Sequence, residues 1–598
     1  MAKKAKVVKE KSIEDRIWDS ANKLRGNLTA SEYQNVVLGL VFLKYISDCF
    51  EKRYQELVEE GDGFEEDRDE YTAEHVFWVP QDARWNVIAS KAHSPEIGQV
   101  IDHALEEIGR ENPRLKKVMP NNYSRPEIDK IRLGEVVEIF DNMDMHAQGE
   151  GLDLFGRVYE YCLQNFAAET QQSGGEFYTP SCIVRTIVEV LQPFEGRVYD
   201  PACGSGGMFV QSAKFIQQHQ GNLRNVTIYG QEFNANTWKM AHMNLAIRGL
   251  EADLGDSWGD SFGDDKHATK KFDFIMANPP FNMSEWGASR LADDVRWKYG
   301  VPPEGNANYA WIQHMIHHLS PTGRIGMVLA NGSLTTTTGG EGDIRRRLIE
   351  ADLVEGVIAM PNQLFYNVSI PVCVWFFNRK KKNPGKVLFI DAREMGMMVD
   401  RTHRELSDDL VRYDTVKKED KPWANLPAEE CDVQRIAATF RAYENGTLED
   451  VKGFCKVATI EEIGNQDWVL TPGRYVGIAD EEEDAEPFAE KMQRLTSELS
   501  GLFAESHRLE DEIKKQLSSI GFPIDNVVPS AIPLDTKIAD LHLAIRTLNI
   551  LKAADFNTLG DIVKLSEFEL LKYKGISQTI YDDVCYMLKS EGLKWGMK

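Results

Sequence analysis

The sequence predicts an α/β protein with a doubly wound, mostly parallel sheet at its centre, and three features of the chain predict it. Short apolar runs of strand length, such as Phe272 to Ala277, alternate with helical stretches. Another such run enters a glycine-rich turn at residues 204–207 and then a helix, as in nucleotide-binding βαβ units. Two further runs, Val354 to Ile358 and Val372 to Phe377, predict an antiparallel pair at the end of the sheet.

The length of 598 residues is too great for one hydrophobic core, so we expect several domains. The eight cysteines are scattered and form no Cys-x-x-Cys pair, which indicates a reducing compartment and no metal site. No apolar segment follows the basic tail, residues 1–11, so it does not resemble a signal peptide. The longest apolar run, Val36 to Tyr45, is too short to span a membrane. The sequence therefore predicts a cytoplasmic protein.

Residues 12–145 are expected to form an N-terminal helical domain. Ser31 and Gln34 have the spacing of a capping box, which predicts the start of a helix just before the apolar run Val36 to Leu43. That run is apolar on nearly every face, so the helix should be buried within this domain or between domains. The domain shows no catalytic spacing, and we expect it to act as a scaffold.

A candidate catalytic motif follows the predicted strand Phe272 to Ala277. Two prolines stop strand and helix alike, because each lacks an N–H and has a fixed φ. They hold an asparagine amide and a backbone carbonyl side by side, and this pair of acceptors suits an amino group that must be oriented. The following aromatic ring offers a face for a planar ligand, although an ordinary Asn-Pro turn is the alternative interpretation. The candidate residues are Asn278, Pro279, Pro280 and Phe281.

Acidic residues follow three predicted strands in succession. Asp200 precedes the glycines with the spacing Asp-x-x-x-Gly-x-Gly, which differs from the dinucleotide pattern and suits a cationic amino acid or a sulfonium group. Glu232 ends the next strand, the position from which a carboxylate reaches ribose hydroxyls. Asp260 is a candidate partner for the base of the same nucleoside. A single acid of this kind is more often a helix cap, but three in succession indicate one ligand site.

The segment from Glu176 to Ser181 is a further part of this candidate site. Thr179 and Pro180 are expected to be the N-cap and first residue of a helix that runs from Ser181 to Gln192. The free N–H groups at a helix start can bind a carboxylate, such as the amino-acid end of a cofactor. A well-capped helix without a ligand is the alternative interpretation.

Taken in order, these motifs resemble those of the S-adenosylmethionine-dependent N6-adenine DNA methyltransferases. The leader from Trp18 to Asp48 is similar to that of the modification subunit of type I restriction-modification systems. The likeness covers about residues 12–475. It implies a Rossmann-like methyltransferase core over residues 146–478, which flips an adenine out of duplex DNA and methylates its N6. The motifs involved are Glu176 to Pro180, Asp200 to Gly207, Glu232, Asn278 to Phe281, Gly323 to Leu329, Ile344 to Ile349 and Leu364 to Trp375.

The resemblance also implies which residues bind S-adenosylmethionine. The glycine-rich turn would lie along the cofactor, Glu232 on its ribose, and residues 176–181 near its methionine part. A stand-alone methyltransferase that acts on RNA or on a protein glutamine is the alternative function. The full implied set is Glu176, Phe177, Tyr178, Thr179, Pro180, Ser181, Asp200, Gly204, Ser205, Gly206, Gly207, Glu232 and Asp260.

Charge and heptad spacing indicate that the protein works with partners. A net charge of −25 would repel DNA phosphates, so we expect a partner to supply much of the DNA contact. Residues 479–520 contain a heptad stripe that predicts a helix docked on another subunit, with packing on the protein's own body as the alternative. The resemblance implies DNA, a specificity subunit and a restriction subunit as partners, with two modification subunits for each specificity subunit. The stripe residues are Phe488, Met492, Leu495, Leu499, Leu502, Leu509 and Ile513.

A small module, residues 534–598, follows a linker at 521–533. It resembles the C-terminal domain of the bacterial RNA polymerase α subunit, a helix-hairpin-helix fold that binds the minor groove. The likeness places Arg546 and Asn549 at DNA-contacting positions. The second contact site of that family departs here to Ser577 followed by Gln578, so contact with a protein remains the alternative.

Overall fold

In this computed structural model the protein forms two compact units, Met1–Asp480 and Glu481–Lys598. The predicted cofactor residues Glu176, Phe177 and Tyr178 lie outside the residues that the structure describes. The described residues are 13–22, 24–25, 28–120, 122–142, 156, 158–163, 165–166, 179–365, 370–409, 421–478, 488–519, 533–541, 543–566, 568–590, 593 and 595–596.

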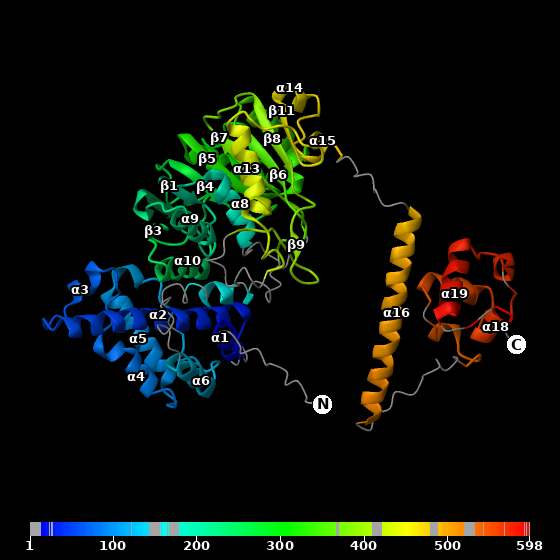
Figure 1. The fold of residues 1–598 in the computed structure, drawn as a ribbon, viewed down its shortest axis with the longest axis horizontal. Coiled ribbons are helices and arrows are strands. Elements are labelled where there is room, and N and C mark those ends of the chain that lie inside the picture. Colours follow the sequence, from blue (N-terminus) through cyan, green and yellow to red (C-terminus); the bar gives the residue numbers. More distant parts are fainter. Residues whose placement is uncertain are drawn as a thin grey trace. The chain divides into compact units, whose positions relative to one another are not determined.

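Helices form the N-terminal part of the first unit (Figure 1). The apolar run of the long helix α2 is buried, as the sequence predicts, and Lys44 within it pairs with Asp48 one turn later. The hydroxyl of Tyr45 donates to the carbonyl of Ala246 at 3.2 Å, so α2 packs against the sheet-containing part of the unit. The helices are α1 (Ile13–Asn22), α2 (Ala30–Glu60), α3 (Arg68–Ala73), α4 (Trp85–Ser90), α5 (Ile97–Glu111) and α6 (Lys130–Asp141).

The start of α2 differs from the sequence prediction. Thr29 is the N-cap, and its hydroxyl accepts from the N–H of Glu32, whose carboxylate accepts from the N–H of Thr29 at 2.9 Å. The capping box predicted at Ser31 and Gln34 is therefore wrong by two residues. Thr29 with Glu32 and Ser31 with Gln34 both have the required spacing. The helix starts at Ala30, so the earlier pair forms the cap.

A nine-stranded sheet forms the rest of the first unit, in the order β11-β8-β6-β7-β5-β4-β1-β2-β3 (Figure 1). The pairings among β3, β2, β1, β4 and β5 are all parallel, which confirms the predicted mostly parallel α/β core. The strands are β1 (Gly196–Asp200), β2 (Val226–Gly230), β3 (Ala252–Asp253), β4 (Phe272–Ala277), β5 (Leu319–Ala330), β6 (Val354–Ala359), β7 (Val372–Asn378), β8 (Lys386–Asp391) and β11 (Cys455–Thr459). A separate pair joins β9 (Met397–Met398) to β10 (Arg404–Glu405).

The predicted antiparallel pair is present but not at the end of the sheet. β6 and β7 pair antiparallel, with Val357 opposite Trp375. β7 also pairs antiparallel with β5, and β8 and then β11 lie on the other side of β6. The prediction that the pair ends the sheet is therefore wrong. Every residue of β7 is buried, because the strand has neighbours on both edges and helices on both faces.

Alternate residues of the strands face two separate cores, and helices cover both. Val328 of β5 and Phe376 of β7 join one core with α8, α9, α10 and α13. Their neighbours Met327 and Trp375 join the other core with α11 and α12. The helices are α8 (Ser181–Leu191), α9 (Gly207–Gln218), α10 (Ala235–Ile247), α11 (Asn308–His318), α12 (Glu341–Glu350), α13 (Asp432–Glu444), α14 (Ile460–Gly464) and α15 (Gly473–Val476).

The second unit contains the long helix α16 (Phe488–Ser519) and a small helical module. From Met492 to Ile513 the apolar stripe of α16 is exposed among the described residues, and Leu502 is 62% exposed. The module has a core of its own that includes Leu551, Ile562 and Val584. Its helices are α17 (Ile545–Ala553), α18 (Leu559–Val563) and α19 (Gln578–Ser590). Across the described residues of both units, no helix has the length and apolar character needed to cross a bilayer.

Replacing Thr29 by alanine should destabilise the helical part of the first unit by about 1 kcal/mol, because the N–H of Glu32 loses its capping acceptor. Ser31→Ala is the matched control and should change the free energy of unfolding by less than about 0.5 kcal/mol. Urea unfolding of the full-length protein, followed by far-ultraviolet circular dichroism, measures both. A larger effect for Ser31→Ala than for Thr29→Ala would contradict the cap assignment.

Candidate active site

The sheet order brings the predicted site motifs to one edge. β4, β1 and β2 are neighbours and run parallel, so their carboxyl ends lie at the same edge of the sheet. Asp200 is the last residue of β1, Glu232 lies just after β2, and Asn278 directly follows β4. This is the edge at which doubly wound folds bind their ligands.

Asp200 is buried beneath the glycine-rich turn. Its carboxylate accepts from the N–H of Ala202 at 2.9 Å, and only 1% of the residue is exposed. Burial raises the pKa of Asp200 well above its usual range, and the nearby Glu232 carboxylate adds to that rise. The contacts show Asp200 shaping the turn from below, while its predicted place along the cofactor stays a prediction.

The glycine-rich turn leaves its backbone open to a ligand. Gly204 and Gly206 have φ values of +54° and +83°, which glycine adopts without strain. A Cβ added at Gly204 or Gly207 would meet no atom within 4 Å, so there is room for close approach. Glu232 anchors the turn from the next strand, because its carboxylate accepts from the N–H of Gly204 at 3.0 Å and of Asn234 at 2.8 Å.

A hydrogen bond joins the first and the last motif of the predicted site, which lie far apart in the sequence. The amide nitrogen Nδ2 of Asn278 donates to the hydroxyl of Thr179 at 2.9 Å. The other end of that amide, Oδ1, is buried and accepts no hydrogen bond from the residues that the structure describes. The Thr179 contact thus fixes the orientation of the amide and leaves one oriented, unused acceptor at the end of β4.

Helix α8 begins at Ser181, as the sequence predicts, but its cap differs from the prediction. The helix begins at Ser181 with Pro180 as its N-cap, and it has no side-chain cap among the described residues. Thr179 was the predicted N-cap and Pro180 the predicted first helical residue, so both assignments are wrong by one position. The Thr179 hydroxyl bonds Asn278 in place of the helix N–H groups. The helix also ends at Leu191, because Gln192 adopts a left-handed conformation.

Four predicted cofactor residues, Thr179, Ser181, Ser205 and Gly207, line a single cavity. Asn244 on α10 and Arg248, the residue that caps the end of α10, line it too, and neither is among the predicted site residues. Asn244 donates to the carbonyl of Ser205 at 2.7 Å, and Arg248 donates to the Glu160 carboxylate at 3.2 Å. No strand-end pattern marks these two residues, because they lie in the interior and at the end of an ordinary helix.

Aromatic residues flank the edge. Phe281 is half-buried and packs edge-on against Phe365, with ring centroids 6.2 Å apart. Phe233 directly follows Glu232 and is 73% exposed, so an aromatic side chain is exposed beside this strand end. Phe233 is not among the predicted site residues, although its place beside a strand-end acid is a usable signal.

Asp260 sits in a tight turn that is tied to the glycine-rich segment. Its carboxylate accepts from the N–H groups of Phe262 at 3.0 Å and Gly263 at 3.1 Å. The next residue, Ser261, donates its hydroxyl to the carbonyl of Pro201 at 2.5 Å. These bonds hold the turn of Asp260 next to the turn that follows β1.

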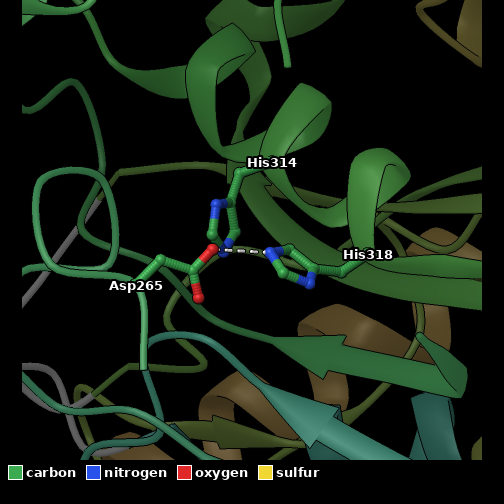
Figure 2. A group of neighbouring side chains, drawn as sticks. All are labelled: Asp265, His314 and His318. Carbon is green, nitrogen blue, oxygen red and sulfur yellow. Dashed lines mark hydrogen bonds and ion pairs between the residues drawn. The ribbon is translucent and has the colours of Figure 1, made fainter. Parts of the chain in front are cut away.

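Asp265, His314 and His318 form a polar group whose two histidines are buried (Figure 2), and their potential metal-ligating atoms lie within 4.8 Å of one another. His318 faces acceptors on both ring nitrogens, the Asp265 carboxylate at 2.8 Å and the Lys270 carbonyl at 3.1 Å. Arg296 has only donors and bonds Nδ1 of His314 at 3.0 Å, so the ring proton of His314 lies on Nε2. Burial lowers the pKa of His314 well below its usual value. The hydrogen bonds therefore occupy the lone pairs that a metal would need.

Family models match most of the sequence. The model described as N-6 DNA Methylase matches residues 150–484, more than half of the sequence. The chain belongs to the N-6 DNA methylase family. The HsdM N-terminal domain model matches residues 13–140 of this methylase, and the model of the C-terminal domain of the bacterial RNA polymerase alpha subunit matches residues 529–590.

Individual relatives agree with the family. The type I restriction enzyme HindI methylase subunit of Haemophilus influenzae is 47% identical over 465 residues, which span 74% of this methylase and all of that protein. The MjaIX methylase subunit of Methanocaldococcus jannaschii is 38% identical over 537 residues, which span 85% of this methylase and 92% of that protein. The resemblance to type I modification subunits drawn from the sequence is confirmed, and so is an adenine-specific methyltransferase as the class of enzyme.

The fold agrees as well. The type I restriction-modification methyltransferase subunit of Streptococcus thermophilus superposes with a TM-score of 0.65 at 23% identity. The match covers 78% of this methylase and 99% of that protein. At that identity the likeness bears on the fold alone.

Replacing Thr179 by valine should lower kcat about 10-fold, because the Asn278 amide loses the acceptor that fixes its orientation. A rise of about 1.4 kcal/mol in the activation free energy corresponds to a 10-fold lower rate. Thr179→Ser keeps the hydroxyl and should retain most of the rate. Single-turnover methylation assays at saturating cofactor measure both variants. A loss in Thr179→Ser as large as that in Thr179→Val would contradict the prediction, because serine keeps the hydroxyl that accepts from the Asn278 amide.

Proposed function

We propose that this methylase transfers a methyl group from S-adenosylmethionine to adenine N6 in duplex DNA, as the modification subunit of a type I restriction-modification complex. The observation that supports this most is the unused acceptor of Asn278. A buried oxygen without a partner costs about 1–3 kcal/mol, so its retention indicates that a ligand donor occupies it during function. An adenine amino group is a donor of the required kind.

The residues at the carboxyl edge fit S-adenosylmethionine. The open backbone at Gly204 and Gly207 gives room for close approach, and Glu232 lies where a carboxylate meets ribose hydroxyls. In this proposal Asp260 would meet the base, and Thr179 and Ser181, which line a cavity, would lie near the methionine part. When bound, S-adenosylmethionine supplies an electrophilic methyl group.

The protein's own residues would orient the target base. An adenine must leave the duplex to be reached, at a cost of a few kcal/mol. Oδ1 of Asn278 and the carbonyl of Pro279 would accept the two hydrogens on N6, which aims the nitrogen lone pair toward the methyl group. Phe281 would stack on the base, and Pro280 keeps the loop rigid because its φ is fixed. Most of the rate would come from holding the two reactants in line.

Partners would supply target choice and much of the DNA contact. We propose that the methylase assembles with a specificity subunit and a restriction subunit, with two modification subunits for each specificity subunit. We also propose that the complex is cytoplasmic. The exposed stripe of α16, with Leu499 at 49% and Leu502 at 62% exposure, fits a helix that packs on another subunit. The net charge of −25 is consistent with DNA contact made largely by that partner.

Asn278→Ala should lower methyl transfer to unmethylated DNA by roughly 100-fold or more, because the oriented acceptor is lost. Asn142→Ala, an exposed asparagine at the end of α6, is the matched control and should keep the full rate. Tritiated S-adenosylmethionine is supplied to the methylase with its neighbouring specificity subunit, and label in DNA is counted. Label in RNA or in a protein glutamine, with none in DNA, would favour the alternative substrates.

We further propose that the last module contacts DNA through Arg546 and Asn549. Both residues are exposed on α17, so both are accessible to a ligand. Their positions match the DNA-contacting ones implied by the resemblance to the polymerase domain. Exposed Ser577 and Gln578 at the second contact site add no positive charge, so any contact would depend on α17.

The double variant Arg546→Ala, Asn549→Ala should weaken DNA binding by the assembled methylase and reduce the salt slope by about one, because one phosphate contact is lost. Lys589→Ala removes an equal charge from an exposed site on α19 and is the control. Fluorescence anisotropy with a labelled duplex at several salt concentrations measures both. An unchanged slope in the double variant would leave protein contact as the role of the module.

A further inference from the structure

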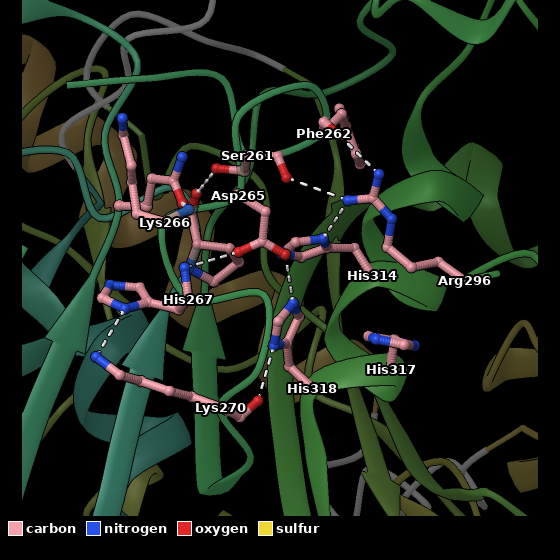
Figure 3. A network of polar contacts seen from close by, with 12 residues as sticks. Ser261, Phe262, Asp265, Lys266, His267, Lys270, Arg296, His314, His317 and His318 are labelled. Atoms are coloured by element: carbon pink, nitrogen blue, oxygen red, sulfur yellow. Dashed lines mark hydrogen bonds and ion pairs between the residues drawn. The ribbon is translucent and has the colours of Figure 1, made fainter. Parts of the chain in front are cut away.

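Helix α11 bonds both loops that form the proposed site. Its first residue, Asn308, contacts the loop that follows Asn278 to Phe281. Of its later residues, His318 bonds Asp265 in the segment that follows Asp260, and His314 bonds Arg296, which in turn bonds that segment (Figure 3). Nearly the whole helix is buried, so packing in the core holds it in place independently of the two loops.

Asn308 grips the catalytic loop through both ends of its amide. Its Oδ1 accepts from the backbone N–H of Asn282 at 3.0 Å, and its Nδ2 donates to Oδ1 of Asn282 at 2.9 Å. The neighbouring N–H of Ala307 donates to the carbonyl of Met283 at 2.9 Å. Asn308 is only 1% exposed, so its own end of these bonds is shielded from water, whereas Asn282 lies at the surface.

The gripped residue has a backbone conformation that needs support. Asn282 has a φ of +52°, in the left-handed region that costs a non-glycine residue energy. Because it directly follows Phe281, its conformation sets the direction in which the backbone leaves the proposed base-stacking ring. Asn308 holds the N–H and the side chain of Asn282 together and thereby keeps this turn in place.

The other half of the helix fixes the cofactor side. Arg296 bonds Nδ1 of His314 at 3.0 Å and donates to the carbonyls of Ser261 at 3.2 Å and Phe262 at 2.7 Å (Figure 3). His318 pairs with Asp265 at 2.8 Å. Burial alone would raise the pKa of Asp265, but the hydrogen bonds from His318 and from the backbone N–H of His267 lower it to about 2. The segment that holds Asp260 is therefore tied to α11 through these groups.

We propose that Asn308 is a positioning residue for methyl transfer. It holds the loop of Asn278 to Phe281 on the same rigid helix that holds the Asp260 segment, so the target base and the cofactor base are placed against one common support. Asn308 contacts neither ligand in this proposal and acts through Asn282. The proposal rests on the function proposed above.

Gln313 provides a matched control on the same helix. It is also 1% exposed, and its amide makes two backbone bonds, from the N–H of Tyr299 at 2.8 Å and to the carbonyl of Gly300 at 2.7 Å. It bonds neither the Asn282 turn nor the Asp260 segment in the contacts that the structure describes. Asn308→Ala and Gln313→Ala therefore remove similar buried amides with different targets.

The test measures kcat, the Kd of S-adenosylmethionine and hydrogen exchange of residues 278–283 in the full-length protein with its specificity subunit. Asn308→Ala should lower kcat about 10- to 100-fold, leave the cofactor Kd within about 2-fold, and speed exchange in that loop. Asn308→Asp keeps the acceptor for the Asn282 N–H and should recover part of kcat. Gln313→Ala should keep kcat within about 3-fold and leave loop exchange unchanged.

Equal losses of kcat in Asn308→Ala and Gln313→Ala would overturn the proposal, because a general loss of packing would then explain both. Unchanged loop exchange in Asn308→Ala would also overturn it. If the wild-type complex fails to methylate DNA, the proposed function fails, while the exchange measurement still tests whether Asn308 holds the loop. Faster exchange in Asn308→Ala alone would then support the positioning role without the methyl transfer.

Discussion

The parallel pairing of β1 with β2 on one side and with β4 on the other is the constraint on which the site depends. Parallel strands end at the same edge, so residues far apart in the sequence become neighbours there. Asp200, Glu232 and Asn278 each follow or end one of these strands. A single slipped register would move a side chain to the opposite face of the sheet and separate the groups. The extensive burial on both faces makes such a slip costly.

The polar side chains at this edge of the sheet differ in whether their hydrogen-bond acceptors are already in use. Asp200, Glu232 and Asp260 use their oxygens to hold backbone N–H groups, so they shape the turns around the proposed cofactor. Asn278 differs, because one end of its amide is fixed by Thr179 and the other end has no partner among the described residues. A folded protein accepts such an unpaired acceptor where function needs it. The acceptor is oriented before any base arrives, which reduces the reorganisation that binding would require.

Buried charge lies directly behind these turns. Arg296 forms an ion pair with Asp294, and His318 hydrogen-bonds Asp265, in a core that is otherwise rich in aromatic rings. Buried pairs add little net stability, because desolvation offsets most of the attraction. Such pairs do fix the positions of the two side chains, because separating them would leave a buried charge without a partner, which is far more costly. Their placement between α11 and the Asp260 segment is therefore better explained by the need to position loops than by a need for stability.

The sequence by itself determined the local parts of this protein. The strand, glycine turn and helix around Asp200, the Asn-Pro-Pro-Phe segment and the buried apolar run of α2 depend on neighbouring residues, so pattern and backbone chemistry were sufficient. The order of the motifs also identified the family. Positions of helix starts were less certain, because Thr29 and Ser31 are both good caps and Thr179 had another use.

Only the tertiary structure decided which distant groups meet. The Thr179–Asn278 bond, the grip of Asn308 on Asn282, and the insertion of β7 between β5 and β6 join segments that no local pattern connects. Asn244 and Arg248 lie on a helix whose sequence shows no sign of the cavity that it lines. The physical reason is that hydrogen bonds and strand pairing depend on distance in space, which the packing of the whole sheet and its helices sets.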